Sequence, residues 1–351
     1  MTNSKITRYF AAANSYNGFV SYFDKVFPSA EFDRIYVIKG GPGTGKSSLM
    51  RQFSDEFKSQ HCEVEEILCS SDPNSLDGVI IKNNQHKVAF IDGTAPHVRE
   101  ANLPGAKDEI INLGENWDDR WLRSQEKEIC TKANQKAKAY KSAYNYLKIA
   151  GACHNVILEV YRANFSITKA KSLAESIIID KSIESNAVET HKLISSFGRN
   201  GNYVLPFPIA EKIKKHGICG NEYTTALFLD YLRDSYKVDC FDMTLYHSAL
   251  DCNLFDGIEL LSQDLIVCKD ENGNINCDEL ATLSPVENES IRSAIKIKEE
   301  AIDEAKRHFL IASNIHFDLE KIYSEAMNFD RNNDIFLKKS AEIKNIVEFS
   351  R

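Results

Sequence analysis

Short apolar runs alternate along the first third of the chain with segments in which apolar residues recur every third or fourth position. The runs at 35–38, 64–69 and 88–91 predict buried strands. After the first run, apolar side chains are spaced by four, as on one face of a helix, at Leu49, Phe53 and Phe57. This alternation predicts an α/β fold with a parallel sheet flanked by helices.

Longer segments predict helices outside this core. From Trp117 to Ala150 the chain is rich in Lys, Glu, Ala and Tyr and contains neither proline nor glycine. Further helices are expected at 153–164, 168–197, 290–327 and 334–349. One interpretation is a bundle that packs the parts of the protein together. The other is a moving lid, or an arm for a protein partner or for self-association.

The chain contains an internal repeat. The pattern D-x-N-x-[LF]-D-G occurs at 72–78 and again at 251–257, each time between two strand-like runs. In the helical parts, Ile-Ala-x-x-x-His occurs with His154 and again with His316, and both histidines are interpreted as packing residues rather than metal ligands. We therefore expect two homologous modules with an α/β core and a helical extension each. The expected modules are 1–195 and 196–351.

Composition narrows the class of protein. With 351 residues, two domains are expected, and a net charge of -8 argues against nucleic acid as a partner. The nine cysteines include no Cys-x-x-Cys pair, which favours reduced thiols over zinc sites or disulfides. The N-terminal segment lacks the apolar core of a signal peptide, and no apolar run is long enough to span a membrane. We expect a cytoplasmic protein without a membrane partner.

A glycine-rich segment after the first strand carries the clearest chemistry. The phosphate-binding pattern G-x-x-x-x-G-K-[ST], known as Walker A, is matched by Gly40, Gly41, Pro42, Gly43, Thr44, Gly45, Lys46 and Ser47. The glycines let successive N–H groups point at phosphate oxygens, and the helix that continues through Ser48 directs its positive end at the same anion. Lys46 is expected to neutralise the β- and γ-phosphates and the Ser47 hydroxyl to bind Mg²⁺. The segment predicts a site for a nucleoside triphosphate, ATP with Mg²⁺.

A second motif supplies an acid for the same site. Asp92 directly follows the third apolar run, as the acid of a Walker B strand does. It is expected to hold Mg²⁺ together with Ser47. Gly93 follows, where many ATPases carry a glutamate that activates water, so a base has to lie elsewhere. His97 is one candidate, because imidazole titrates near neutral pH, and Asp72 is another. Thr94 is expected to contact the γ-phosphate. The predicted catalytic residues are Lys46, Asp92, Thr94 and His97.

The second module has lost the motif. Its corresponding segment is read as 217–224, with Glu222 in place of the last glycine and Tyr223 in place of the lysine. A tyrosine beside an added carboxylate should abolish tight binding of a triphosphate. The Thr-Ala-Pro-His segment after Asp92 also has no counterpart, which favours an active-site role for it. Asp72 and Asp77 recur in this module and are therefore interpreted as turn and helix-cap residues.

These motifs together resemble a known family. IKGGPGTGKS, SSDPNSLDGV, FIDGTAPH and LPGAKDEIINLGENWD are similar to segments of a largely uncharacterised bacterial family of ATPases built from two tandem P-loop modules. The resemblance covers nearly the whole chain and is strongest over 8–165. It implies a fold of duplicated P-loop NTPase-like modules with long helical insertions. In the family the second module usually carries its own intact loop, and this chain departs from that at Glu222 and Tyr223.

The leading hypothesis is a Mg²⁺-dependent ATPase. Hydrolysis in the first module would drive a conformational change, and the second module would be structural or regulatory. A kinase for a small molecule or nucleoside is an alternative, for which Arg99, Arg120 and Arg123 are available to bind an acceptor. A nucleotide-sensing scaffold without turnover is another, because no glutamate follows Asp92. The sequence does not distinguish ATP from GTP.

Overall fold

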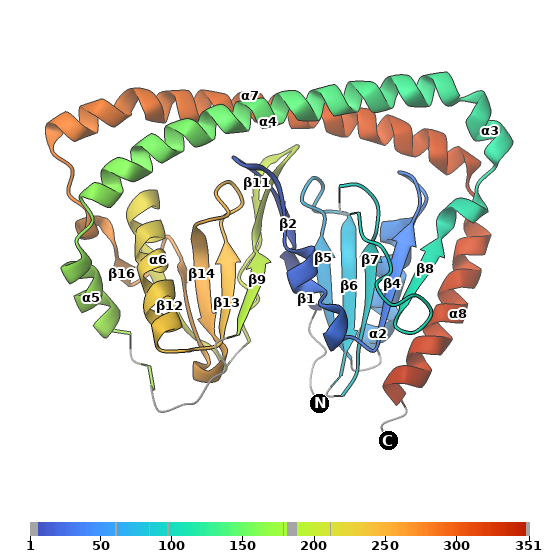
Figure 1. Cartoon of the computed structure of the whole chain (residues 1–351), viewed down its shortest axis with the longest axis horizontal. Coiled ribbons are helices and arrows are strands. Elements are labelled where there is room, and N and C mark those ends of the chain that lie inside the picture. Colours follow the sequence, from blue (N-terminus) through green and yellow to red (C-terminus); the bar gives the residue numbers. More distant parts are fainter. Residues whose placement is uncertain are drawn as a thin grey trace.

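The computed structural model describes residues 6–59, 62–83, 85–96, 98–177, 179–180, 188–210 and 212–348. One sheet of 12 strands forms the body of the protein. Two long helices lie side by side across the ends of its strands (Figure 1). The α/β class predicted from the sequence is confirmed. None of the described helices is apolar over enough of its length to cross a membrane.

The first half of the sheet contains six strands in the order β1-β5-β6-β7-β4-β8, and we call it the first half-sheet. β4 is parallel to both of its neighbours, β7 and β8, as expected around a phosphate loop. The steps from β5 to β6 and from β6 to β7 are antiparallel, so the sheet is mixed rather than parallel throughout. The strands are β1 (Ile6–Phe10), β4 (Arg34–Lys39), β5 (Glu63–Leu68), β6 (Leu76–Lys82), β7 (Lys87–Asp92) and β8 (Asp108–Asn112).

The second half-sheet repeats this arrangement strand for strand, in the order β9-β13-β14-β15-β12-β16. Its parallel and antiparallel steps occur at the corresponding places. The two half-sheets join where Phe10 of β1 meets Leu193 of β9 in an antiparallel pair. The strands are β9 (Glu189–Leu193), β12 (Lys214–Cys219), β13 (Met243–His247), β14 (Phe255–Leu260), β15 (Leu265–Lys269) and β16 (Ile275–Asn276).

Each half-sheet has a β-hairpin directly after its first strand. A hairpin of β2 (Ala12–Ser15) and β3 (Gly18–Ser21) follows β1, and a hairpin of β10 (Ser195–Gly198) and β11 (Gly201–Val204) follows β9. The expected module boundary at residue 195 falls at the first residue of β10. Short helical turns are α1 (Phe23–Val26), η1 (Ser29–Glu31), η2 (Leu113–Asn116), α3 (Asp119–Ser124), η3 (Leu261–Gln263) and η4 (Asp278–Leu280).

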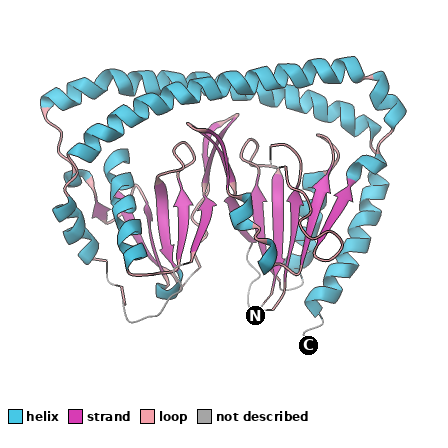
Figure 2. Ribbon diagram, viewed as in Figure 1, coloured by secondary structure: helices cyan, strands magenta, loops and turns pink. Residues whose placement is uncertain are grey.

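Two long helices, α4 (Glu126–Ala163) and α7 (Pro285–Ala326), form a layer over both half-sheets (Figure 2). The sequence colours of Figure 1 show that they run antiparallel. The helix expected at 117–150 is divided into α3 and α4, and α4 continues through Gly151 to include the helix expected at 153–164. At Gly151, Tyr16 packs too closely for a side chain. The helix expected at 168–197 is wrong. α5 ends at Glu175, and Glu189–Leu193 form strand β9, which pairs with β13 instead.

The terminal helix of each half packs on the other half-sheet. Ala170 of α5 (Ile167–Glu175), which follows α4, lies in the core cluster of the second half-sheet with Phe228. α8 (Phe329–Glu348), which follows α7, returns to the first half-sheet, where Phe336 contacts Phe53 and Ile343 is fully buried. The remaining core helices are α2 (Lys46–Ser59) and α6 (Glu222–Val238). Each folded half therefore contains one helix from the other half of the chain.

The D-x-N turns are alike in the two halves. The Asp72 carboxylate accepts the backbone N–H of Asn74 at 3.1 Å, and the Asp251 carboxylate accepts that of Asn253 at 3.1 Å. These are the turns that the repeated pattern predicts. The helix-cap interpretation of Asp77 is wrong, because Asp77 is the second residue of strand β6 and no helix starts there.

Candidate functional site

The predicted phosphate loop connects β4 to α2 at the carboxyl edge of the first half-sheet. β4 ends at Lys39 and α2 begins at Lys46, so the residues between them form the loop. Gly43 has φ 69° and Gly45 φ 87°, a conformation that side chains disfavour. The Thr44 hydroxyl donates to the Gly41 carbonyl at 2.9 Å and closes the curve. The glycine positions of the motif are thus the positions where this backbone needs glycine.

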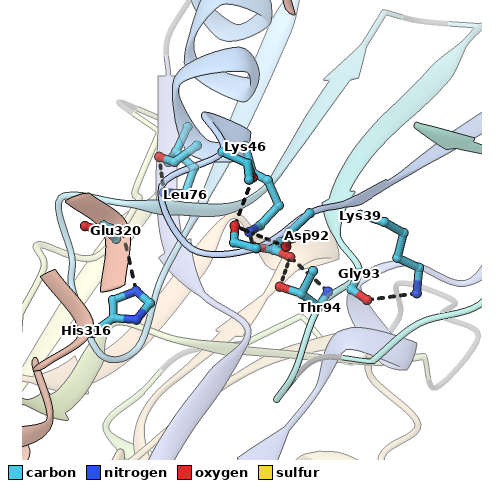
Figure 3. Close-up of polar contacts among 12 residues, drawn as sticks. Lys39, Lys46, Leu76, Asp92, Gly93, Thr94, His316 and Glu320 are labelled. Atoms are coloured by element: carbon cyan, nitrogen blue, oxygen red, sulfur yellow. Dashed lines mark hydrogen bonds and ion pairs between the residues drawn. The ribbon is translucent and has the colours of Figure 1, made fainter. Parts of the chain in front are cut away.

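Lys46 and Asp92 meet across two neighbouring strands (Figure 3). Ile38 of β4 pairs with Asp92 of β7, and this register brings Asp92 Oδ2 to 3.7 Å from Lys46 Nζ. The Lys46 ammonium group also donates to the carbonyls of Gly40 at 3.1 Å and Gly41 at 2.8 Å. Lys46 is only 11% exposed, so this cation is held within the curve of the loop.

Thr94 fixes the Asp92 carboxylate. Asp92 Oδ1 accepts the Thr94 backbone N–H at 2.9 Å and the Thr94 hydroxyl at 2.6 Å. Burial raises the pKa of Asp92 above its usual value, although Lys46 and the Thr94 hydrogen bonds oppose this rise. The geometry places Thr94 as a positioning residue for Asp92.

Ser47 and Asp92 offer oxygen ligands of the kind that Mg²⁺ prefers. The Ser47 hydroxyl accepts the Leu76 N–H at 2.9 Å, which anchors it beside the start of β6 (Figure 3). The next residue, Ser48, is exposed in the first turn of α2. Among the described residues there is no cluster of three or more His, Cys, Asp or Glu side chains that could hold a metal ion alone. A hydroxyl and one carboxylate fit a Mg²⁺ ion that keeps several waters and shares phosphate oxygens.

The remaining residues proposed from the sequence are His97 and three arginines. His97 is outside the described residues. The Arg99 guanidinium donates to the Phe27 carbonyl at 2.8 Å, while Arg120 and Arg123 are exposed on α3. The three arginines therefore do not converge on one acceptor pocket.

The end of α7 and the start of α8 cover the loop, which the sequence did not predict. The Ser324 hydroxyl donates to the Gly43 carbonyl at 3.0 Å, and the Asn332 amide donates to the Thr44 carbonyl at 2.9 Å. A Cβ at Gly41 would lie 2.8 Å from the Tyr323 ring. The predicted phosphate loop of the first half is thus in direct contact with the end of α7 and the start of α8.

Three charged or titratable groups on the long helices also face this site. His316 Nε2 lies 3.5 Å from Glu320 Oε1, one turn further along α7, and His316 Nδ1 lies 3.4 Å from Lys136 Nζ of α4. Burial, with the positive charges of Lys136 and Lys46, lowers the pKa of His316 to about 4. Burial raises the pKa of Glu320, and Asp72 adds to this rise. The repeat had marked His316, but its interpretation as a packing residue missed this position near Lys46.

The corresponding segment of the second half-sheet is not a degenerate loop. Ile218 pairs with Lys269 as Ile38 pairs with Asp92, so β12 corresponds to β4. Only Gly220 and Asn221 then separate β12 from α6. Gly217, expected at the start of a loop, lies inside β12, where its missing side chain admits Gly273 of the neighbouring segment. The predicted match of 217–224 to the phosphate-binding pattern is therefore wrong. The connection in the second half is shorter than the loop of the first half, instead of a loop of the same length with other residues in it.

The groups around this shortened connection differ in charge from those of the first half. The Asp278 carboxylate accepts the Asn221 N–H at 2.7 Å, at the start of α6 where an anion would otherwise bind. Tyr223 accepts a hydrogen bond from Lys298 of α7 at 2.9 Å. Lys269, at the position of Asp92, pairs with Asp256 at 2.8 Å. The second half thus has the same strand order as the first, but a lysine stands at the position of Asp92 and a carboxylate lies at the start of the helix.

Comparison of the chain with models of known protein families, with curated proteins and with solved structures finds no match.

Proposed function

We propose that the first half-sheet binds ATP with Mg²⁺ at Gly40–Ser48 and hydrolyses it. The observation that carries this proposal is the position of Lys46, which lies inside a glycine loop and 3.7 Å from an acid at the end of the adjacent parallel strand. A lysine, a hydroxyl and an acid in this relation are the recurring parts of a P-loop triphosphate site. The resemblance of the motifs to tandem P-loop ATPases supports the same interpretation, with the second half as a copy that lost its loop.

The residues of the chain would act as follows. Lys46 would exchange its bonds to the Gly40 and Gly41 carbonyls for phosphate oxygens, because the stronger negative charge attracts the ammonium group more. Ser47 and Asp92 would hold Mg²⁺, which neutralises phosphate charge when bound, and Thr94 would keep the Asp92 carboxylate oriented. This arrangement accounts for binding and positioning by residues of the first half-sheet alone.

Turnover would depend on groups from the helices. Gly93 occupies the place of the usual glutamate, and besides Asp92, which is assigned to the metal, Glu320 of α7 is a nearby acidic side chain whose pKa is raised. A carboxyl group with a raised pKa is suited to accept a proton from water near neutral pH. Because Ser324 of the same helix contacts the loop at Gly43, a change in the loop would be transmitted to α7. This contact supports coupling of hydrolysis to a conformational change.

Release of inorganic phosphate from ATP and from GTP tests the proposed activity. We expect Mg²⁺-dependent release by the purified chain without any added acceptor, and slow turnover, because Gly93 supplies no base. Phosphate transfer that appears only when small hydroxyl compounds or nucleosides are added would instead favour a kinase. Nucleotide binding with no release under any condition would favour a nucleotide-sensing scaffold.

One ATP is expected to bind per chain. The second half has only Gly220 and Asn221 between β12 and α6, and the Asp278 carboxylate occupies the start of α6, so the described connection provides neither a loop nor a lysine of its own for phosphates. Equilibrium dialysis with labelled ATP and Mg²⁺ measures the number of sites. A second tight site that survives loss of the first would contradict this account of the second half.

A further inference from the structure

A cavity of about 570 Å³ opens at the edge of the second half-sheet where the first half carries its phosphate loop. It is lined by residues at the carboxyl ends of β13 and β15, by the segment that continues from β11 and by the start of α6. Its volume is in the range of about 300–1,000 Å³ that is usual for small-molecule sites. The residues that matter for its chemistry are Tyr16, His154, Tyr223, Asp256, Lys269 and Ser248.

The charges in the cavity wall are already paired. Lys269 lies 2.8 Å from Asp256, and Lys215 lies 2.6 Å from Asp270. With the Asp278 carboxylate at the start of α6, no free cation is offered to a phosphate among the described lining residues. A ligand with a triphosphate would meet these carboxylates at close range. The wall therefore selects against a ligand that carries phosphate groups.

One side of the cavity is aromatic. The Tyr16 and His154 rings are 5.1 Å apart, and the His154 and Tyr223 rings 5.3 Å. Tyr161 stacks on Tyr223 from behind, with ring centroids 5.0 Å apart and planes within 13°. Aromatic rings arranged in this way provide a flat, rigid surface for another ring.

His154 has hydrogen-bonding capacity that the described protein does not use. It is 3% exposed and lines the cavity, yet its Nδ1 has no hydrogen-bond partner among the described residues. Its Nε2 lies 3.2 Å from Asp251 Oδ2 but does not have the geometry of a hydrogen bond to it. A buried ring nitrogen without a partner costs free energy unless something binds it. The counterpart of His154 in the first half, His316, lies near Lys46 instead.

We propose that this cavity binds an uncharged small molecule that combines a heteroaromatic ring with hydroxyl groups, a nucleoside without phosphate being the class that fits. The ring packs on the aromatic side formed by Tyr16, His154 and Tyr223. The hydroxyl groups bind the carboxylates of the polar side, where the Asp256 carboxylate also accepts a hydrogen bond from the Ser195 hydroxyl at 3.3 Å. This site is separate from the ATP site proposed for the first half and does not depend on it.

The probe for this site is 2-aminopurine riboside, whose fluorescence is quenched when its base stacks on aromatic rings. We expect saturable quenching by the full chain, and the same quenching in the presence of excess ATP and Mg²⁺. His154→Phe should weaken riboside binding about tenfold, because it removes the ring nitrogens and keeps the ring. Ser248→Trp, which fills the cavity from a half-buried position, should abolish it. His316→Phe, the matched change in the first half, should leave riboside binding unchanged.

Two results would overturn the proposal. One is absence of quenching by the folded wild-type chain. The other is displacement of the riboside by ATP together with unchanged binding in Ser248→Trp, which would locate the riboside in the first half. Thermal melts of each variant show whether it has folded. Because riboside binding is read with and without ATP, failure of ATP to bind at the phosphate loop would not obscure the outcome.

Discussion

Replacing Lys46 with alanine is expected to weaken binding of ATP and Mg²⁺ by orders of magnitude while the protein stays folded. The Lys46 ammonium is buried to 11% exposure inside the loop, where a charge interacts strongly with phosphate because little water screens it. Its own protein partners are two backbone carbonyls and the more distant Asp92, so its loss leaves no strong ion pair broken. Calorimetric titration with ATP and Mg²⁺ measures the effect.

A matched control is Lys215→Ala. Lys215 lies in the strand of the second half-sheet that corresponds to β4 and forms a 2.6 Å ion pair with Asp270. Its removal changes the net charge by the same amount but should leave ATP affinity as in the wild type. Equal affinity of Lys46→Ala and the wild type would refute the proposed phosphate site.

Asp92→Asn is expected to reduce turnover by on the order of a hundredfold, since a metal ligand is worth several kcal/mol in the transition state. The substitution keeps the size of the side chain and its capacity to accept from Thr94, so the melting temperature should stay near that of the wild type. It removes the negative charge that faces Lys46 and Mg²⁺. Phosphate release measured over a range of Mg²⁺ concentrations should show a weakened dependence on the metal.

The control for this change is Asp256→Asn in the second half-sheet. Asp256 forms an ion pair with Lys269 at 2.8 Å, so its loss should lower stability and leave hydrolysis unchanged. If Asp92→Asn retained full turnover with the Mg²⁺ dependence of the wild type, Asp92 would have no role as a metal ligand. The base and the metal site would then have to be sought among Asp72, Asp77 and Glu320.

The sequence predicted those parts of the site that depend on neighbours along the chain. The loop 40–47 and its flanking elements follow from local periodicity and glycine positions. The pairing of Thr94 with Asp92 also involves residues only two apart, but the sequence assigned Thr94 to the γ-phosphate and did not predict this contact. The turns at Asp72 and Asp251 are local as well, and they lie at corresponding places in the repeated strand order of the two half-sheets.

The parts that were missed depend on contacts between distant segments. Ser324 and Asn332 reach the loop only because α7 crosses to the first half-sheet, and no periodicity within a helix specifies the surface on which it packs. The prediction for the second loop is wrong because it takes Gly217 as the first residue of the loop, whereas strand pairing with β15 places that residue inside β12. The expected helix to residue 197 failed for a similar reason, since pairing with β13 makes 189–193 a strand.

The crossing of the terminal helices has a consequence for how the chain is made. α8 supplies Phe336 and Ile343 to the core of the first half-sheet, although more than 200 residues separate α8 from the last strand of that half-sheet. During synthesis the N-terminal strands emerge first, with this apolar face still uncovered. The face is closed only when α8 has left the ribosome, so the first half reaches its final stability after the strands of the second half-sheet have been made. A nascent chain of this architecture must therefore keep an incomplete core soluble throughout the translation of the second half.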